Sequence, residues 1–259
     1  MALSDSPNQT YNLPNIDHMN EHLERTFNYF FGTQSLPCPY IEGRTERKVV
    51  TDLRGPGAEK FYQKLSQAGF RRSHNLAYSP ACPNCESCVP VRIVVSDFKP
   101  TRSFSRIQRI NKNLLIEEMD ASATIEQFNL FSTYQRERHS TGEMAGMTFN
   151  DYKCMVEDTP VTSRIIEFRK GTGKLVGVML MDRLGDGLSA VYSFFDITIP
   201  RQSLGTFMIL WMIEEASRYR LPYVYLGYWV ENCDNMSYKT RFQPVEMLRQ
   251  NIWSICKTS

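Results

Sequence analysis

Three cysteines in the first half of the chain have a spacing that suits metal binding. Cys82, Cys85 and Cys88 form a C-x2-C-x2-C pattern, and Cys38 is the natural source of a fourth thiol. Four thiolates are a common ligand set for a tetrahedral zinc ion or an iron–sulfur cluster. The alternative is a group of reduced, partly buried thiols in a proline-rich turn. The spacing leaves both interpretations open.

A row of cations follows the cysteines. At the helical period, the segment that begins near residue 102 separates into an apolar face and a basic face. The basic face carries Arg102, Arg106, Arg109 and Lys112. These cations could neutralise phosphates along a nucleic-acid backbone, which confers affinity without reading the base sequence. A solvated helix face is the alternative interpretation.

The composition is that of a globular protein and restricts where nucleic acid could bind. Of 259 residues, 42% are hydrophobic and 22% are charged, which suits one large or two ordinary domains. Lys and Arg outnumber Asp and Glu by only 30 to 28, so a nucleic-acid site requires local clustering. The start lacks a secretion-signal pattern, and the longest apolar run, residues 207–213, is too short to span a bilayer. We therefore expect a cytoplasmic protein with reduced thiols.

The first half of the chain is predicted to form a cysteine-containing lobe over residues 1–120. Apolar residues at helical spacing predict a first helix around residues 19–30. A second helix is predicted over residues 58–68, with Phe61, Leu65 and Ala68 buried and Gly69 at its end. The basic helix closes this lobe.

The second half, residues 121–259, is predicted to form a mixed-sheet lobe. Capping-box patterns at Thr124 and Thr148 each predict the start of a helix. Three strands, near residues 162–169, 174–183 and 187–196, are separated by GTGK and GDG turns, which indicates an antiparallel meander. A helix over residues 203–219 and a buried strand over 221–229 follow. This order predicts an α+β fold of the acetyltransferase-like (GNAT-like) kind, in which two strands splay to open a notch.

Several long segments carry a family resemblance. The chain contains CPYIEGRTER, GFRRSHNLAYSPACPNCESCVPVRI, FKPTRSFSRIQRINKNL, GLSAVYSFFD, SLGTFMILWMIEEA, LPYVYLGYWV and MSYKTRFQPVE. In this order they resemble the arginyl-tRNA–protein transferase family over nearly the whole chain. The resemblance is closest to the bacterial branch, which transfers leucine to proteins that begin with Asp or Glu and marks them for N-end rule degradation.

The resemblance implies particular partners. They are an aminoacyl-tRNA, with Leu-tRNA favoured, and proteins with N-terminal Asp or Glu, without a membrane. It also implies that no acetyl-CoA takes part. The chemistry is aminolysis of an ester that is already activated, so it requires no cofactor and no nucleophilic cysteine.

The notch of the acetyltransferase-like fold is the expected place for this reaction. Its walls should be residues 192–196 and 226–229. Asp196 is the candidate proton acceptor, with a strand-end turn carboxylate as the alternative. The hydroxyls that could bind the ester or the ribose belong to Tyr192, Tyr228 and Tyr238, although buried tyrosines with satisfied hydroxyls are common.

Cations and a helix start supply further candidates for substrate binding. Free N–H groups near Gly205, at the start of the helix after the meander, could hold the terminal tRNA phosphate, and Lys239 and Arg241 could meet nearby phosphates. An arginine suits the acidic side chain of the acceptor protein because it binds a carboxylate through two hydrogen bonds. The candidates are Arg44, Arg47, Arg71, Arg72 and Arg92.

Two other functions fit part of the sequence. An acetyl-CoA-dependent N-acetyltransferase fits the predicted order of elements, but Phe207 stands where an acyl-carrier loop needs a small residue. A non-catalytic, metal-containing RNA-binding protein fits the cysteines and the basic helix, but it gives the second lobe no role.

Overall fold

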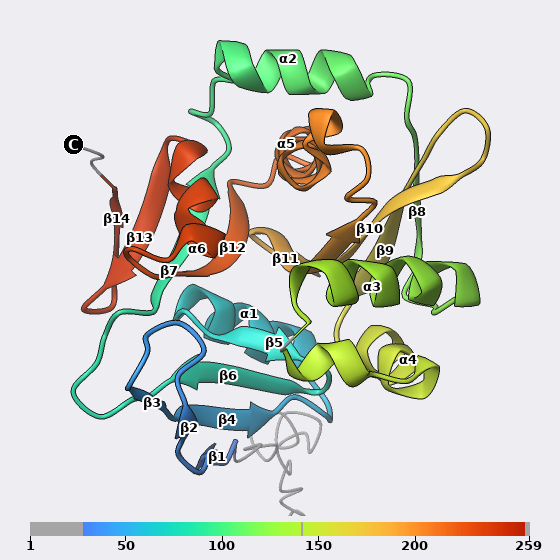
Figure 1. Cartoon of the computed structure of the whole chain (residues 1–259). Helices are drawn as coiled ribbons and strands as arrows, with labels where there is room; N and C mark the ends of the chain where they lie inside the picture. The colour runs from blue at the N-terminus through green and yellow to red at the C-terminus, as the bar shows by residue number, and fades with distance from the viewer. Residues whose placement is uncertain (1–27, 141, 257–259) are drawn as a thin grey trace, which may run out of the picture.

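The structure, a computed structural model, describes residues 28–140 and 142–256. A small antiparallel sheet in the first half of the chain has the strand order β1-β4-β6-β5 (Figure 1). Its strands are β1 (Phe30–Gly32), β4 (Lys48–Asp52), β6 (Leu76–Pro80) and β5 (Arg71–Ser73). Two short strands, β2 (Leu36–Pro37) and β3 (Thr45–Glu46), pair separately beside it.

A larger, mixed sheet has the strand order β14-β13-β7-β12-β11-β10-β9-β8. Its strands are β7 (Val89–Val94), β8 (Leu115–Asp120), β9 (Ser163–Arg169), β10 (Leu175–Leu184), β11 (Gly187–Phe195), β12 (Tyr223–Trp229), β13 (Val245–Arg249) and β14 (Ile252–Ile255). Strands β9, β10 and β11 form the predicted antiparallel meander. Strands β11 and β12 pair in parallel after a helical crossover. The predicted α+β, acetyltransferase-like class is therefore confirmed.

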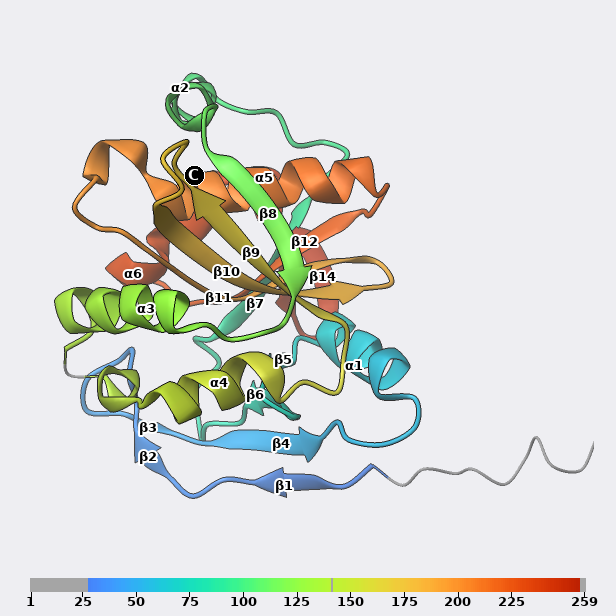
Figure 2. The same ribbon diagram turned by 90° about the vertical axis from the view of Figure 1, so that its right-hand side faces the viewer.

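Helices cover both faces of the large sheet. They are α1 (Ala58–Gln67), α2 (Arg102–Asn111), α3 (Ile125–Arg138), α4 (Phe149–Glu157), α5 (Leu204–Arg218) and α6 (Asp234–Ser237), with the 3-10 helices η3 (Glu143–Gly146), η4 (Pro200–Gln202) and η5 (Tyr238–Arg241). Helix α5 lies on one face with α2 outside it, and α3 and α4 lie on the other face (Figure 2). No helix in the described residues is long and apolar enough to cross a membrane.

Both predicted capping boxes are present. The Thr124 hydroxyl accepts a hydrogen bond from the Gln127 backbone N–H, and the Gln127 side chain accepts one from the Thr124 N–H. Thr148 and Asp151 form the same reciprocal pair at the start of α4. These bonds satisfy N–H groups that have no partner inside the helix, which fixes where α3 and α4 begin.

Helix α2 is held to the large sheet by its aromatic anchor. Phe104 is 1% exposed and stacks on Phe242, with ring centroids 4.8 Å apart. The Thr101 hydroxyl caps the helix by accepting a hydrogen bond from the Phe104 N–H. The predicted basic face consequently stays at the surface, where Arg102, Arg106, Arg109 and Lys112 are all exposed.

Helix α1 connects the two sheets. Its buried residues include Ala58, Tyr62 and Leu65, which pack in one cluster with residues of both sheets. The helix was predicted correctly, and Phe61 packs half-buried against this cluster, but Ala68 is exposed, so that predicted core position is wrong. Tyr62 faces the second sheet, which an analysis of one helix alone does not reveal.

Two further predictions concern the first helix and the boundary between the two lobes. The predicted first helix, around residues 19–30, lies mostly outside the described residues, and its last position, Phe30, belongs to β1. The division at residue 120 stays a prediction. Strands β7 and β8 precede that position, yet both belong to the large sheet, and β7 lies between β12 and β13.

Candidate functional site

The predicted notch forms where β11 and β12 separate. The two strands pair only over Gly187–Ser189 and Tyr223–Tyr225, although β11 continues to Phe195 and β12 to Trp229. Strand β12 keeps pairing with β7 on its other side, and its register shifts between Tyr225 and Gly227. Bulges of this kind bend a strand and are frequent beside active sites. The carboxyl ends of β11 and β12 therefore border a notch.

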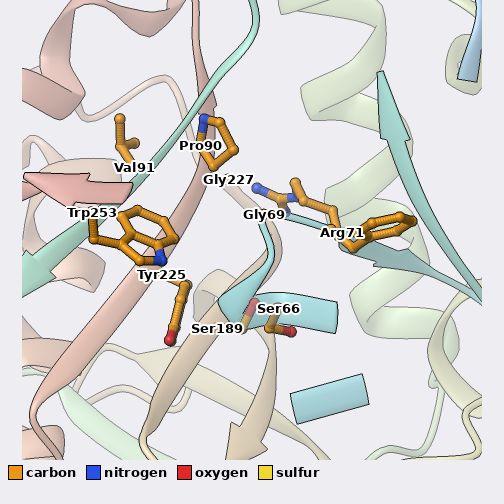
Figure 3. A pocket seen from close by; sticks show the side chains of 10 residues that line it. Ser66, Gly69, Arg71, Pro90, Val91, Ser189, Tyr225, Gly227 and Trp253 are labelled. Carbon is orange, nitrogen blue, oxygen red and sulfur yellow. The ribbon is translucent and has the colours of Figure 1, made fainter. Parts of the chain in front are cut away.

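Arg71, from β5 of the small sheet, enters this notch (Figure 3). Its Nη2 donates hydrogen bonds to the carbonyl oxygens of Ala190, at 2.7 Å, and Val191, at 3.1 Å. These are β11 carbonyls that lack a β12 partner beyond the splay. Gly227 makes room for the guanidinium: a β carbon there would overlap it, and the Gly227 φ of 77° also favours glycine.

The cavity beside Arg71 is small. Its volume is about 10 Å³, which is room for about one water molecule. The Ser66 hydroxyl lines it and has no hydrogen-bond partner among the described residues. The innermost part of the notch is thus largely filled by Arg71, and a substrate would have to bind nearer the strand ends.

A larger cavity lies at the end of β11. This β11-end pocket, between α3 and residues 195–198, has a volume of about 310 Å³. Phe195 forms part of its wall and packs against Tyr134 of α3, with ring centroids 5.2 Å apart. Asp196 is one of its lining residues, so the pocket lies at the same end of β11 as the notch. Its aromatic wall was missed in the sequence because Tyr134 and Phe195 come from separate elements.

The three candidate tyrosines differ in how free their hydroxyls are. The Tyr228 hydroxyl lies 3.0 Å from the Gly69 carbonyl oxygen and 3.1 Å from that of Tyr78, so it joins β12 to the small sheet. The Tyr192 hydroxyl accepts a hydrogen bond from Gln135 Nε2 at 2.6 Å. Tyr238 is 37% exposed. The structure thus favours a structural role for Tyr228 and leaves Tyr192 and Tyr238 as candidates.

Asp196 is engaged by its neighbours at the end of β11. Its carboxylate accepts hydrogen bonds from the Lys174 ammonium at 2.8 Å and from the Thr198 N–H at 3.0 Å and hydroxyl at 2.6 Å. Burial opposes ionisation, but these hydrogen bonds prevail and lower the pKa of Asp196. A carboxylate with a lowered pKa is a weaker proton acceptor. The structure therefore favours the alternative interpretation, a strand-end turn carboxylate.

Lys239 does not lie at the surface. It is 6% exposed, and its ammonium donates a hydrogen bond to the Tyr228 carbonyl oxygen. The prediction that Lys239 contacts tRNA phosphates is therefore wrong, because the folding of η5 back onto the end of β12 turns this side chain inward. A lone Lys in an otherwise polar segment gives no sequence signal of such burial.

Arg241 lies at the surface next to the basic helix. It is exposed, and its guanidinium carbon lies 5.6 Å from the centre of the Phe104 ring of α2. Arg241 and the exposed cations of α2 are together called the basic surface below. Gly205 lies at the start of α5, where a β carbon would press on the Phe195 ring. Its small size therefore has a packing explanation as well as the proposed role in phosphate binding.

The five candidate arginines for the acceptor occupy different environments. Arg44 and Arg47 are exposed near the cysteines. Arg72 forms a fully buried ion pair with Asp182, at 2.7 Å. Arg92 pairs with Glu246 at 2.7 Å and lies over the Tyr223 ring at 3.5 Å. These bonds favour structural roles for Arg72 and Arg92, and Arg71 is the candidate inside the notch.

Comparison with known proteins places this geometry in a family. A sequence profile described as the N terminus of arginine-tRNA-protein transferase matches residues 36–106, and one described as its C terminus matches residues 126–249. The chain belongs to the arginine-tRNA-protein transferase family. An aspartate/glutamate leucyltransferase of Paramagnetospirillum magneticum is 55% identical over 225 residues, which are 87% of this chain and 92% of that protein. One from Rhodospirillum rubrum is 54% identical, with the same coverage of both chains.

Two solved structures were also found to be similar. They are L-PGS from Bacillus licheniformis and FemX, each with a TM-score of 0.46. L-PGS is 12% identical and the alignment covers 65% of this chain and 59% of that one. FemX is 8% identical, with 73% and 64% covered.

Four of the seven cysteines, Cys38, Cys82, Cys85 and Cys88, gather in one region. Burial, and then the nearby Cys38, Cys82 and Cys85 thiols, together raise the pKa of Cys88 to about 11. Nevertheless, no group of three or more potential ligands in the described residues is arranged to hold a metal ion. The thiols fit zinc or an iron–sulfur cluster by their chemistry but not by this arrangement.

No step proposed below therefore depends on a metal. Metal analysis of anaerobically purified protein tests the site that the cysteine spacing predicts. Less than about a tenth of an equivalent of zinc or iron per chain would contradict that prediction.

Replacing Lys239 with methionine is expected to remove a pH dependence of folding stability. Burial, and then the Arg71 charge, lower the pKa of Lys239 from 10.5 to about 7, while Cys233 and Cys88 act in the opposite direction. Between these two pH values the unfolded chain binds a proton that the folded chain has released. The free energy of unfolding should therefore rise with pH across this window. At pH values below the window, Lys239 is charged in the folded protein, and the cost of burying its ammonium is greatest.

The effect can be measured by urea denaturation of both proteins at about pH 7.5 and pH 9. The wild type should gain up to about 1.4 kcal/mol per pH unit relative to K239M. Other titrating groups occur in both proteins and cancel in the difference. Equal pH dependence of the two proteins would contradict the prediction.

Proposed function

We propose that this transferase moves leucine from Leu-tRNA to the N-terminal α-amine of proteins that begin with Asp or Glu, which marks them for N-end rule degradation. The observation that carries the proposal is the 55% identity to a relative named aspartate/glutamate leucyltransferase, over 92% of that protein. The notch and the basic surface are consistent with it.

The proposed reaction needs little chemistry from the protein. The neutral amine of the acceptor attacks the ester carbonyl carbon, a C–N bond forms, and the C–O bond to the terminal ribose breaks. The amine loses one proton and the departing ribose hydroxyl gains one. Orientation of two bound reactants can supply about 7 to 11 kcal/mol of the barrier, so a rigid notch is the main requirement. Tyr192 and Tyr238 are the hydroxyls that we propose bind the ester or the ribose.

An assay with three donors tests the function. Labelled Leu-tRNA, Arg-tRNA or acetyl-CoA is incubated with the protein and peptides that differ only at residue one. Transfer should require Leu-tRNA and a peptide that begins with Asp or Glu. Transfer from acetyl-CoA, or equal use of all N-terminal residues, would contradict the proposal.

We propose that the tRNA acceptor arm binds the basic surface of α2 and Arg241. The four α2 cations are exposed, and no carboxylate among the described residues forms an ion pair with them. Helix α2 packs on α5, whose first turn lies beside Phe195 at the notch wall. A strand of RNA crossing α2 could therefore deliver its 3′ end to the notch.

Charge reversal on this surface is expected to weaken tRNA binding. The double variant R106E/R109E should lower the affinity for tRNA at least about tenfold. The magnitude of the slope of log K against log salt should also fall by about 1 to 2, because fewer phosphate contacts form and fewer counterions are released on binding. Filter binding at several salt concentrations measures both. The control K60E/K64E makes the same charge change on exposed residues of α1. Equal effects of the two double variants would contradict this assignment.

Arg71 is the residue that we propose binds the acidic side chain of the acceptor. It is partly buried in the notch, and no carboxylate of the described residues pairs with it. A partly desolvated cation without a counter-ion is a good partner for a substrate carboxylate. Only Nη2 has hydrogen-bond acceptors in the described residues, so other guanidinium donors remain for a ligand that approaches from the open end.

A further inference from the structure

The β11-end pocket is large enough for a ligand and is not explained by packing. Its volume of about 310 Å³ lies in the size range of small-molecule sites, about 300 to 1,000 Å³. Of its lining residues, Phe195 is the last residue of β11 and Asp196 follows it directly. The pocket and the notch therefore lie at the same end of β11.

Most of the pocket wall is apolar. Leu130, Ile197 and the packed rings of Tyr134 and Phe195 form it. Tyr134 is 8% exposed and belongs to the core under α3, which makes the wall rigid. A branched aliphatic side chain suits such a surface, because its burial requires no hydrogen-bond partner.

The charged part of the wall opposes a cationic side chain. Asp196 is the one carboxylate among the described lining residues, and it is already bound by Lys174 and Thr198. The Asp196 side chain is only 9% exposed, whereas that of Lys174 is 60% exposed. An arriving guanidinium would therefore meet an ammonium instead of a free carboxylate, and repulsion of this kind is a recognised source of specificity.

We propose that the β11-end pocket receives the leucyl side chain of Leu-tRNA, and that the Lys174–Asp196 pair excludes arginine. This inference rests on the proposed function and adds the residues that select the amino acid. Leu130, Tyr134, Phe195 and Ile197 bind the isobutyl group, while Lys174 neutralises Asp196, the one carboxylate among the described lining residues.

Three variants test the pocket in transfer assays with Leu-tRNA, Phe-tRNA, Ala-tRNA and Arg-tRNA. L130A enlarges the pocket and should raise the Phe-to-Leu ratio of kcat/KM by about tenfold. Changes of one or two methylene groups in a hydrophobic pocket alter discrimination on this scale. L130W fills it and should reduce leucine transfer more than transfer of a smaller residue such as alanine. K174M frees Asp196 and should raise the Arg-to-Leu ratio by about tenfold. Thermal melting checks that each variant is folded.

The matched control is K153M. Lys153 also pairs with a carboxylate, Glu157, but on the surface of α4 and away from the pocket. Its amino acid preference should equal that of the wild type. A wild type that transfers no leucine would reject the proposed function itself.

Two results would overturn the pocket assignment while the function stands. In the first, the L130 variants lower transfer of all aminoacyl groups equally. That result would mean that the pocket holds a part shared by all tRNAs, such as the terminal adenosine. In the second, K174M leaves the Arg-to-Leu ratio of kcat/KM unchanged. That result would mean that charge at this site does not select the amino acid.

Discussion

Replacing Arg71 with methionine is expected to lower kcat/KM for Asp-initiated peptides by at least about 30-fold. Removal of one partner from a desolvated charge pair costs about 2 to 5 kcal/mol, which corresponds to roughly 30-fold or more. Peptides that begin with Asn lack the charge, so their low rate should change little. Kinetics with matched Asp and Asn peptides measure this change in preference.

The controls separate recognition from folding. R71K keeps the charge but not the two-pronged geometry, and should recover part of the rate. R44M and R47M remove exposed arginines and should stay within about twofold of wild type. Since Arg71 also binds the Ala190 and Val191 carbonyls, thermal melting must show that R71M is folded. A folded R71M that keeps the wild-type preference for Asp would rule out this role.

Replacing Arg72 with methionine is expected to destabilise the protein by about 3 to 5 kcal/mol, because it leaves the Asp182 carboxylate buried without its counter-ion. Both side chains of this pair are 0% exposed. Arg72 Nε and Nη2 each donate to Asp182 at 2.7 Å, and Nη1 donates to the His74 carbonyl oxygen at 2.8 Å. Urea denaturation measures the difference.

A second variant identifies the cause of that loss. R72M/D182L replaces both charges with apolar groups of similar size and should recover most of the stability, because a buried ion pair seldom outperforms good packing. The prediction fails if R72M costs less than about 1 kcal/mol, or if the double variant is less stable than R72M.

Elements governed by local interactions were predictable from the sequence. The capping boxes at Thr124 and Thr148 mark helix starts because both partners lie within three residues. The meander of β9, β10 and β11 was equally accessible, since its turns join neighbouring strands. The position of β7 between β12 and β13 was not, because that pairing joins distant segments whose register no local pattern specifies.

The site was only partly predictable for the same reason. The order of elements placed one notch wall at residues 192–196, and residue type named Arg71 as one of five candidate arginines. Neither could show which arginine enters the notch. Lys239 was assigned to the surface by its charge and is buried. The β11-end pocket depends on α3 lying under β10 and β11, which is a tertiary arrangement (Figure 2).

The position of β7 between β12 and β13 affects how the chain folds during synthesis on the ribosome. Strand β7 hydrogen-bonds to residues that are translated roughly 130 to 140 positions later. At about 5 to 20 residues per second, this strand waits on the order of ten seconds for its neighbours. During that interval its valines and isoleucine are exposed beside a growing polypeptide, so newly made chains should depend on chaperones that shield apolar segments.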